Sequence, residues 1–276
     1  MTQGTVLETT LEAVLETVLE TAMIFAAGRG ERMRPLTDTV PKPLLEVGGK
    51  ALIVWQIEAL AAAGVRRIVI NHAWLGDAIE TALGDGSRWG VEIAYSREGA
   101  QALETAGGIA RALSLICGQP VSGQSVAQHS VFLAVSGDVY TDFDYAALQS
   151  RAKALHAQAE PGLHLVMVPN PAYHPRGDFV LDGGRLVPQS GAEHAQRLTF
   201  ANIGLYDSRT FAPIAATDPI PRMALLPVYQ EAIATGRATG ECWHGRWANV
   251  GTPEDLATLD RALRAKLTPD DGNARA

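Results

Sequence analysis

The sequence predicts an α/β fold: a Rossmann-like, mixed and mostly parallel sheet flanked by helices. Short apolar runs typical of buried strands alternate with segments of helical apolar spacing along the first half of the chain. Strands separated by helices pair in parallel through right-handed crossovers, so this alternation indicates a parallel sheet. Hydrophobic residues make up 47% of the 276 residues, which is enough for the core of one large α/β domain.

The expected elements of the first half follow in chain order. We expect strands at 23–27, 66–72, 91–96 and 131–138, and helices at 51–64, 73–83 and 107–116. The last of these strands, VFLAVSGD, ends in a glycine and an acid, at the sheet edge where open α/β sheets bind ligands. The polar, turn-rich segment 117–130 is expected to be a surface insertion.

The second half is richer in β-structure, and the whole chain reads as one domain. We expect a strand at 164–169, a hairpin at 178–187, and strands at 198–206 and 244–252. The single domain is predicted to cover residues 22–265. Residues 1–21 repeat leucine and glutamate every four residues and are expected to be a helical or disordered extension, with an oligomerisation helix as the alternative. Residues 266–276 are expected to be a flexible tail.

Composition excludes several classes of function. The net charge is −7 and no basic run carries interleaved aromatic residues, which argues against nucleic-acid binding. No apolar stretch is long enough to span a bilayer, so no membrane association is expected. Cys117 and Cys242 lie far apart in the sequence, which suits a reducing cytoplasm and offers neither a disulfide framework nor a zinc motif.

The stretch AAGRGERMRPLTDTVPKPL, residues 26–44, concentrates glycine and positive charge directly after the first strand. It does not fit the phosphate loop G-x-x-x-x-G-K-[ST]. It also fails the dinucleotide motif G-x-G-x-x-G, because Met33 occupies the place of the third glycine. Any phosphate bound here must therefore be held in another way.

Small residues and two cationic side chains offer a different way to hold a phosphate. Ala27, Gly28 and Gly30 allow backbone N–H groups to approach a nucleotide, while Arg32 and Lys42 add full charges. A triphosphate carries about four negative charges, and arginine and lysine form strong charge-assisted bonds with phosphate. The stretch therefore predicts a nucleotide site, with a solvated basic loop as the alternative.

The same stretch resembles the motif of the sugar-1-phosphate nucleotidyltransferases, G-x-G-x-R-[LM]-x-P-L-T followed by P-K-P-[LM], at every position. The resemblance continues through SGDVYTDFD, RGDF, FANIGLY and WANVGTPEDL and covers residues 22–263. Within the family, INHAWLG, GDGSRWG and LETAGGI are similar to the N-acetylmuramate-1-phosphate uridylyltransferases. The resemblance implies a GT-A-like nucleotidyltransferase fold and a monomer or small homo-oligomer.

The implied reaction transfers a uridylyl group from UTP to N-acetylmuramic acid 1-phosphate, giving UDP-N-acetylmuramate and pyrophosphate in peptidoglycan recycling. The sugar's phosphate oxygen is already ionised at neutral pH, so the attack needs cations and positioning rather than a general base. The sequence agrees, because it has neither a G-x-S-x-G elbow nor an H-E-x-x-H motif. Two alternatives stay open: another substrate pair, such as GTP with mannose 1-phosphate or dTTP with glucose 1-phosphate, and a regulatory subunit without turnover.

The resemblance also implies a set of site residues. The expected catalytic residues are Arg32, Lys42 and Asp138. The expected nucleotide contacts are Ala27, Gly28, Gly30, Glu31, Arg32, Lys42, Thr105, Gly107 and Gly108. The expected sugar-phosphate contacts are Ser136, Gly177, Asp178 and Asn202. A plain helix start and hydrogen bonds at strand ends are the alternative explanations for the last two sets.

Mg²⁺ is the expected cofactor, held by few protein carboxylates together with phosphate oxygens. Asp138 matches the family's metal-binding aspartate. In WANVGT, Asn249 stands where the family usually has an aspartate, and an amide oxygen can still bind Mg²⁺ as a neutral dipole. The alternatives are a turn role for Asp138 and a helix cap for Asn249, so the number of ions stays open.

Overall fold

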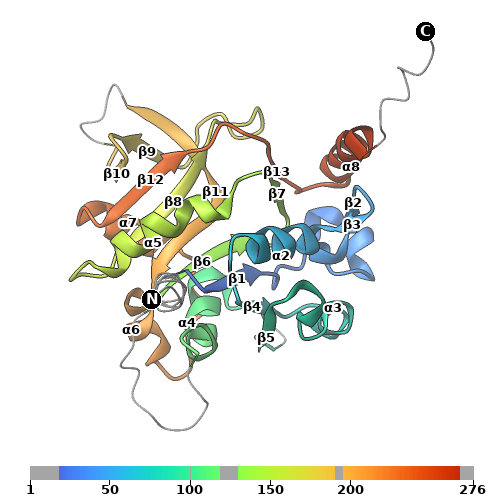
Figure 1. Ribbon diagram of the computed structural model, residues 1–276, viewed down its shortest axis with the longest axis horizontal. Helices are drawn as coiled ribbons and strands as arrows, with labels where there is room; N and C mark the ends of the chain where they lie inside the picture. Colours follow the sequence, from blue (N-terminus) through green and yellow to red (C-terminus); the bar gives the residue numbers. More distant parts are fainter. Residues whose placement is uncertain (1–18, 100, 119–129, 190–194, 268–276) are drawn as a thin grey trace, which may run out of the picture.

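The computed structural model describes residues 19–99, 101–118, 130–189 and 195–267 (Figure 1). Most of the expected extension, most of the expected insertion at 117–130 and the chain beyond 267 lie outside the described residues. Two expectations from composition can be compared with this structure. Over the described ranges no helix is long and apolar enough to cross a membrane. Cys117 and Cys242 are both free thiols, so they do not form a disulfide.

The elements alternate as the sequence predicts through the first half. The main sheet contains β1 Thr21–Phe25, β4 Arg67–His72, β5 Glu92–Arg97, β6 Val131–Ser136, β8 Leu163–Val168, β9 Phe179–Asp182, β10 Arg185–Val187, β11 Gln196–Asp207 and β12 Ala238–Cys242. Two small two-stranded sheets pair β2 Glu46–Val47 with β3 Lys50–Ala51, and β7 Val139–Thr141 with β13 Trp247–Asn249.

The helices complete the fold. They are α2 Leu52–Ala62, α3 Gly76–Leu83, α4 Glu104–Ile116, α5 Gln149–His156, α6 Ala212–Ala215, α7 Leu226–Ala234 and α8 Pro253–Leu267. Short 3₁₀ turns lie between them at η1 Glu31–Met33, η2 Leu36–Asp38, η3 Lys42–Leu44, η4 Ser87–Trp89, η5 Tyr145–Leu148 and η6 Ser208–Thr210.

The nine-stranded sheet has the order β5-β4-β1-β6-β11-β8-β12-β10-β9 (Figure 1). The strands β5, β4, β1 and β6 are parallel, as the alternation of strands and helices predicts. Beyond β6 the sheet is mixed, because β11 is antiparallel to both β6 and β8, and β9 and β10 form the predicted hairpin. The sequence did not predict β12, whose residues ATGEC lack apolar alternation and are held by parallel pairing with β8.

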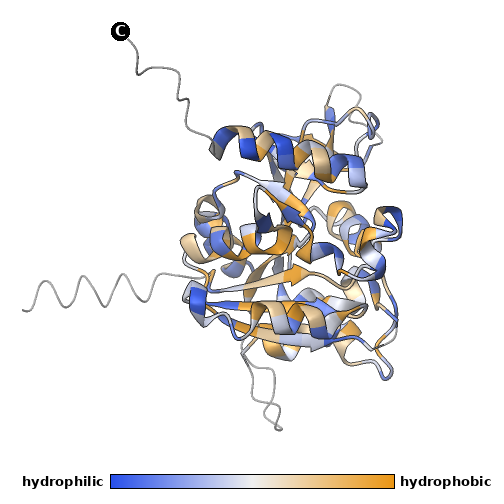
Figure 2. Cartoon of the chain, turned by 90° about the vertical axis from the view of Figure 1, so that its right-hand side faces the viewer, coloured by the Kyte–Doolittle hydropathy of each residue, from blue (hydrophilic) through white to orange (hydrophobic). Residues whose placement is uncertain are grey.

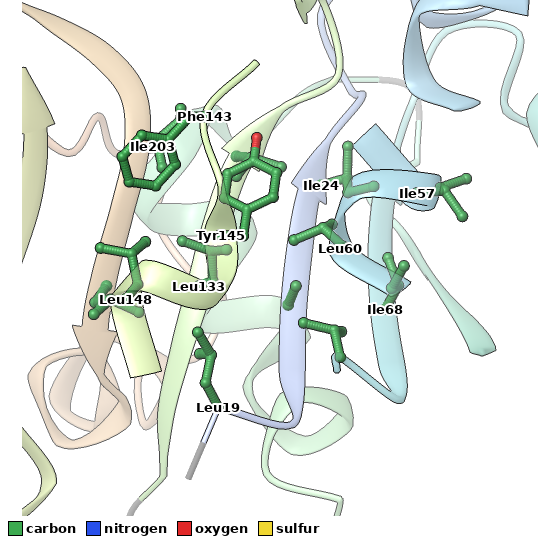
Figure 3. Packing of buried hydrophobic residues seen from close by; sticks show 14 of the residues in the cluster. Leu19, Ile24, Ile57, Leu60, Ile68, Leu133, Phe143, Tyr145, Leu148 and Ile203 are labelled. Carbon is green, nitrogen blue, oxygen red and sulfur yellow. The ribbon is translucent and has the colours of Figure 1, made fainter. Parts of the chain in front are cut away.

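Buried strands present alternate side chains to two helix-covered faces. On β1, Ile24 joins a cluster with Ile57 of α2, whereas Met23 on the opposite face packs with Ile109 of α4. Figure 3 shows Ile24, Ile57 and neighbouring side chains of the first cluster packed together. Burial on both faces explains why the first strand is a continuous apolar run rather than an alternating one.

A third, smaller cluster joins helix α8 to the glycine-rich loop. Met33 of η1 is fully buried with Val47 of β2, Val250, and Leu259 and Leu263 of α8. Helix α8 contains both hydrophobic and hydrophilic residues, as its mixed colours in Figure 2 show. The bulky residue in the place of a third glycine therefore anchors the loop to α8, which explains why the dinucleotide motif is not present.

The start of the domain differs from the expected boundary. Leu19 is fully buried, and its N–H donates to Gln149 Oε1 at 3.3 Å. Strand β1 begins at Thr21. A leucine of the four-residue repeat thus packs into the core although it precedes the predicted boundary at residue 22, and the bounds of the domain stay a prediction. At the other end, α8 continues to Leu267, beyond the predicted limit of 265.

Candidate active site

The glycine-rich loop folds back on itself between β1 and β2. Gly30 has a φ of 69°, and its carbonyl accepts a 2.8 Å hydrogen bond from Thr37 Oγ1. A Cβ at Gly30 would lie 3.2 Å from Lys42 Cβ and 3.0 Å from Thr37 Cγ2. Glycine is required here because the backbone is left-handed and the two arms of the loop touch. The fold-back brings Gly30 against Lys42, twelve positions later.

Lys42 contacts Asp138 directly as an ion pair. The two residues are 96 positions apart in sequence, and the parallel pairing of β1 with β6 brings them together. The Lys42 side chain is 11% exposed and the Asp138 side chain 26%, so both are largely shielded from water. The structure thus places two of the three expected catalytic residues in contact.

Arg32, the third expected catalytic residue, lies beside the turn between β13 and α8. A Cβ at Gly251 would be 3.3 Å from the guanidinium nitrogens of Arg32, so this glycine leaves room for the arginine. Arg29 pairs with Glu31 and Arg34 pairs with Asp38, whereas the structure gives Arg32 no ion pair within the described ranges. Arg32 is exposed and available for a ligand, while Glu31 is also exposed but engaged with Arg29.

A buried carboxylate holds the start of the loop from behind. Ala26 N–H donates to Asn71 Oδ1 at 3.1 Å, and Asn71 Nδ2 donates to Glu98 Oε1 at 2.6 Å. Glu98 Oε2 in turn accepts from Leu103 N–H at 2.6 Å. Burial raises the pKa of Glu98. The chain of contacts fixes the loop after β1 against the entrance of helix α4.

The expected nucleotide contacts at the start of α4 have packing roles in this structure. Thr105 Oγ1 accepts a 2.9 Å hydrogen bond from Leu225 N–H. A Cβ at Gly107 would meet Pro221 O at 2.5 Å, and one at Gly108 would meet Glu98 Oε1 at 2.6 Å. Glycine is therefore needed at both positions so that Pro221 and Glu98 can approach helix α4 closely. A contact of these glycines with nucleotide stays a prediction. Ala27 is buried at the beginning of the loop and Gly28 is exposed.

The small β7–β13 sheet places Asn249 next to Asp138. Asn249 pairs with Val139, and Val250 N–H donates to Asp138 O at 3.0 Å. The expected alternative, in which Asn249 caps α8, is wrong. Thr252 caps that helix instead, because its Oγ1 accepts from Asp255 N–H while Asp255 Oδ2 accepts from Thr252 N–H at 2.9 Å.

The donor atoms at this position suit a hard cation. One carboxylate and one amide oxygen are oxygen ligands of the kind that Mg²⁺ uses together with phosphate oxygens and water. Among the described residues no group of three or more His, Cys, Asp and Glu side chains gathers into a metal site. The residues therefore fit an ion shared with bound phosphates better than a dedicated protein cage.

A pocket of about 290 Å³, called here the inner pocket, adjoins Asn249 on the antiparallel side of the sheet. Its lining residues are Tyr173, His174, Asp178, Phe179, Thr199, Phe200, Asn202, Leu226, Tyr229, Trp247 and Asn249. Two of the expected sugar contacts, Asp178 and Asn202, thus share one pocket with the expected metal ligand Asn249. Ser136 ends β6 and Gly177 precedes Asp178, and neither lines the inner pocket.

A β-bulge turns Asn202 into this pocket. The register of β11 against β8 shifts between Phe200 and Gly204, and Asn202 has a φ of 58°. Bulges re-aim side chains at functional sites, and a non-glycine residue with positive φ costs free energy that the surrounding structure must supply. Asp178 fixes the neighbouring backbone, because its Oδ2 accepts from Phe200 N–H at 2.8 Å.

Sequence reasoning missed the aromatic walls of the inner pocket. Tyr173, Phe200, Tyr229 and Trp247 come from four separate segments of the chain. The hydroxyl of Tyr229 is 2.7 Å from that of buried Tyr206, and burial raises the pKa of Tyr229 well above its usual range. Trp247 and Phe200 carried a sequence signal, because they stand in the motifs WANVGT and FANIGLY. Tyr173 and Tyr229 carried none, and they lie in a loop and on helix α7.

The chain is similar to known proteins over most of its length. A family model described as "Nucleotidyl transferase" matches residues 21–266. N-acetylmuramate alpha-1-phosphate uridylyltransferase from Neisseria meningitidis serogroup B is 48% identical over 234 residues, which cover 84% of this chain and 93% of the relative. The protein of the same name from Caulobacter vibrioides is 32% identical, covering 88% of this chain and 96% of the relative.

Solved structures show the same fold. A putative glucose-1-phosphate thymidylyltransferase from Bacillus anthracis superposes with a TM-score of 0.71 at 20% identity, covering 88% of this chain and 95% of that one. The inositol-1-phosphate CTP transferase from T. maritima superposes with a TM-score of 0.66 at 20% identity, covering 94% and 100%. With the loop motif, the paired Lys42 and Asp138, and a family model that matches most of its length, this chain belongs to the nucleotidyl transferase family.

Proposed function

We propose that the protein transfers a uridylyl group from UTP to N-acetylmuramic acid 1-phosphate, releasing pyrophosphate and forming UDP-N-acetylmuramate. The observation that carries this proposal is the 48% identity to the Neisseria uridylyltransferase over nearly the whole relative. The site supports it, because polar and aromatic side chains line the inner pocket. One of them, Asn249, is joined by the β7–β13 pairing to the turn that carries Asp138, the ion-pair partner of Lys42. We place the reaction in the cytoplasm, where UTP is made.

In this proposal the chain's own residues position and neutralise phosphate. The sugar phosphate enters from the inner pocket, and its oxygen attacks the α-phosphorus of UTP in line with the departing pyrophosphate. Arg32 and Lys42 neutralise charge that develops on the phosphate oxygens, and backbone N–H groups of the loop at Gly28 and Gly30 hold the nucleotide. No side chain is required as a general base, because the attacking oxygen is already ionised.

Mg²⁺ dependence is the second part of the proposal. Asp138 and Asn249 would hold the ion, which supplies further charge neutralisation at the phosphates when bound. The Asn249 side chain offers a dipole where an aspartate would offer a charge. We therefore expect Asn249→Asp to shift the Mg²⁺ activation midpoint to lower concentration, and Asn249→Ala to shift it upward. Equal midpoints for the wild type and both variants would show that position 249 is not a ligand.

The test of the substrates is a matrix of nucleotides and sugar 1-phosphates with pyrophosphate release as the readout. UTP with N-acetylmuramic acid 1-phosphate should give the highest kcat/KM. A preference for GTP with mannose 1-phosphate, or for dTTP with glucose 1-phosphate, would replace the proposed substrates but keep the reaction class. No turnover with any pair would favour a regulatory subunit and contradict the proposal.

A further inference from the structure

A second depression of about 690 Å³, called here the outer hollow, adjoins the inner pocket. His174, Asp178, Phe179 and Leu226 line both, so the two lie side by side. Arg176 and Arg197 line the outer hollow only. We propose that Arg176 binds a carboxylate carried by the sugar substrate and thereby makes the enzyme selective for an acidic acceptor. This inference rests on the proposed function, because the lactyl ether of N-acetylmuramic acid supplies such a carboxylate.

The charges in the outer hollow leave Arg176 available for a ligand. His174 Nε2 lies 3.0 Å from Asp178 Oδ1, so the acid at the boundary of the two spaces has a partner. Arg197 donates to Gly177 O at 3.1 Å and to Gln189 Oε1 at 2.6 Å. In the described part of the chain, Arg176 has no hydrogen bond and no ion pair. A guanidinium in this situation is suited to a carboxylate, which it can bind with two parallel hydrogen bonds.

The backbone on both sides of Arg176 is fixed. Asn170 Nδ2 donates to Pro175 O at 3.2 Å, and Arg197 Nε holds Gly177 O. Gly177 has a φ of 59°, and a Cβ there would lie 2.6 Å from Asn170 Oδ1 and 2.8 Å from Leu198 O. The arginine therefore stands on a braced turn, and little loop ordering is needed when a ligand binds. The same contacts explain why residue 177 is a glycine, and its expected contact with the sugar stays a prediction.

The geometry of the acceptor points its carboxylate toward this turn. The 1-phosphate must lie near Lys42, Asp138 and Asn249 for the transfer to occur. The sugar ring then occupies the inner pocket. The lactyl group leaves the ring at O3, two carbons from C1, so its carboxylate reaches beyond the ring, and the outer hollow adjoins the inner pocket where it can be received. A net positive lining at this place is notable in a chain whose net charge is −7, and it matches a ligand whose far end is negative.

The experiment compares two acceptors that differ only by the lactyl ether. N-acetylmuramic acid 1-phosphate carries the carboxylate, and N-acetylglucosamine 1-phosphate lacks it. For Arg176→Ala we expect kcat/KM to fall by about tenfold with the first, since a charge-assisted hydrogen bond is lost. With N-acetylglucosamine 1-phosphate, used as a substrate or as a competitive inhibitor, kcat/KM or Ki should stay within twofold of wild type, as should KM for UTP. Arg176→Lys should restore part of the loss.

Arg66→Ala is the matched control. Arg66 is exposed and precedes β4, at the sheet edge opposite the glycine-rich loop. The substitution therefore removes the same charge as Arg176→Ala without touching the inner pocket or the outer hollow. Arg66→Ala should leave kcat/KM, or Ki, unchanged with both acceptors. Equal losses for both acceptors in Arg176→Ala, or no loss for either, would overturn the carboxylate assignment while leaving the proposed uridylyl transfer intact. A wild-type enzyme that uses neither acceptor but turns over another sugar phosphate would refute the proposed function itself.

Discussion

The two sides of this site, which we propose bind phosphate and sugar, are built in different ways. The phosphate side comes from one continuous stretch, residues 26–44, with Asp138 from the neighbouring parallel strand. The sugar side gathers side chains from the loop before β9, from β11, α7 and β13, and turns one of them inward with a bulge. Binding a phosphate chain requires charge and backbone N–H groups, which a single loop can supply. Enclosing a sugar requires a shaped wall, which only distant segments together can form.

Replacing Asp138 should give the largest effect on the phosphate side. Asp138→Asn removes both the expected metal ligand and the partner of Lys42, so turnover should fall by about a thousandfold at any practical Mg²⁺ concentration. Initial rates of pyrophosphate release across a Mg²⁺ series measure this. Asp144→Asn is the control, because Asp144 caps η5 through Ala146 N–H and asparagine caps equally well. A rate within tenfold of wild type for Asp138→Asn would remove Asp138 from the catalytic set.

Replacing the two cationic side chains of the loop should give the next largest effect. Arg32→Ala and Lys42→Ala are each expected to lower kcat by about 10²-fold, in the range seen when one charge-stabilising donor is lost. Arg34→Ala changes the same charge in the same loop, but Arg34 pairs with Asp38 on the exposed side and should cost less than about twofold. Circular dichroism should show that all three variants stay folded. If Arg34→Ala were as damaging as the other two, the loop would act by its overall charge rather than through specific residues.

On the sugar side, two substitutions at Asn202 separate the effect of its side chain from the effect of its backbone conformation in the bulge. Asn202→Gly removes the side chain but accepts a φ of 58°, whereas Asn202→Ala removes it and adds backbone strain of about 1 kcal/mol. Both variants should raise KM for the sugar phosphate several-fold and leave KM for UTP unchanged. Only the alanine variant should also lose stability in urea unfolding. An unchanged KM for the sugar phosphate in the glycine variant would mean that Asn202 serves the bulge and does not bind substrate.

The smallest effect concerns stability and the link between the loop and α4. Burial raises the pKa of Glu98 in the folded state, so its contribution to stability is complete below the ordinary value of 4.5 and is lost as pH rises through the raised value. The free energy of unfolding should therefore fall by at most about 1.4 kcal/mol per pH unit in that window. Glu98→Gln should remove this slope, measured by urea unfolding at a series of pH values.

The carboxyl of Glu80 titrates in a different pH range, so it does not interfere with the Glu98 measurement. The hydrogen bond from Arg97 lowers the pKa of Glu80 to about 2, so the contribution of Glu80 to stability is lost only as pH falls below 4.5. The two groups thus act in separate pH windows and with opposite sign. A slope above pH 4.5 that persists unchanged in Glu98→Gln would show that another group causes it.

The residues proposed for the phosphate side could be named from the sequence because they lie in recognisable local patterns. Arg32 and Lys42 stand in one motif, and Asp138 follows a strand that the apolar pattern predicts. Among the residues that line the inner pocket, Asp178 and Asn202 could be named only because a short motif contains each of them. The aromatic walls depend on which strands pair beyond β6, and that mixed order follows from tertiary packing rather than from local periodicity. The burial of Leu19 was missed for the same kind of reason.

Strand β11 belongs to both sides of the site. Its residues Ile203–Asp207 pair with β6, while Gln196–Leu198 pair with β9. The bulge lies between these two arms. The residues of β11 that line the inner pocket, Thr199, Phe200 and Asn202, stand between the two arms, where neither β6 nor β9 pairs with them. We therefore expect that substitutions at these three positions alter the pocket wall while the ladder with β6 keeps the strand in place beside Asp138.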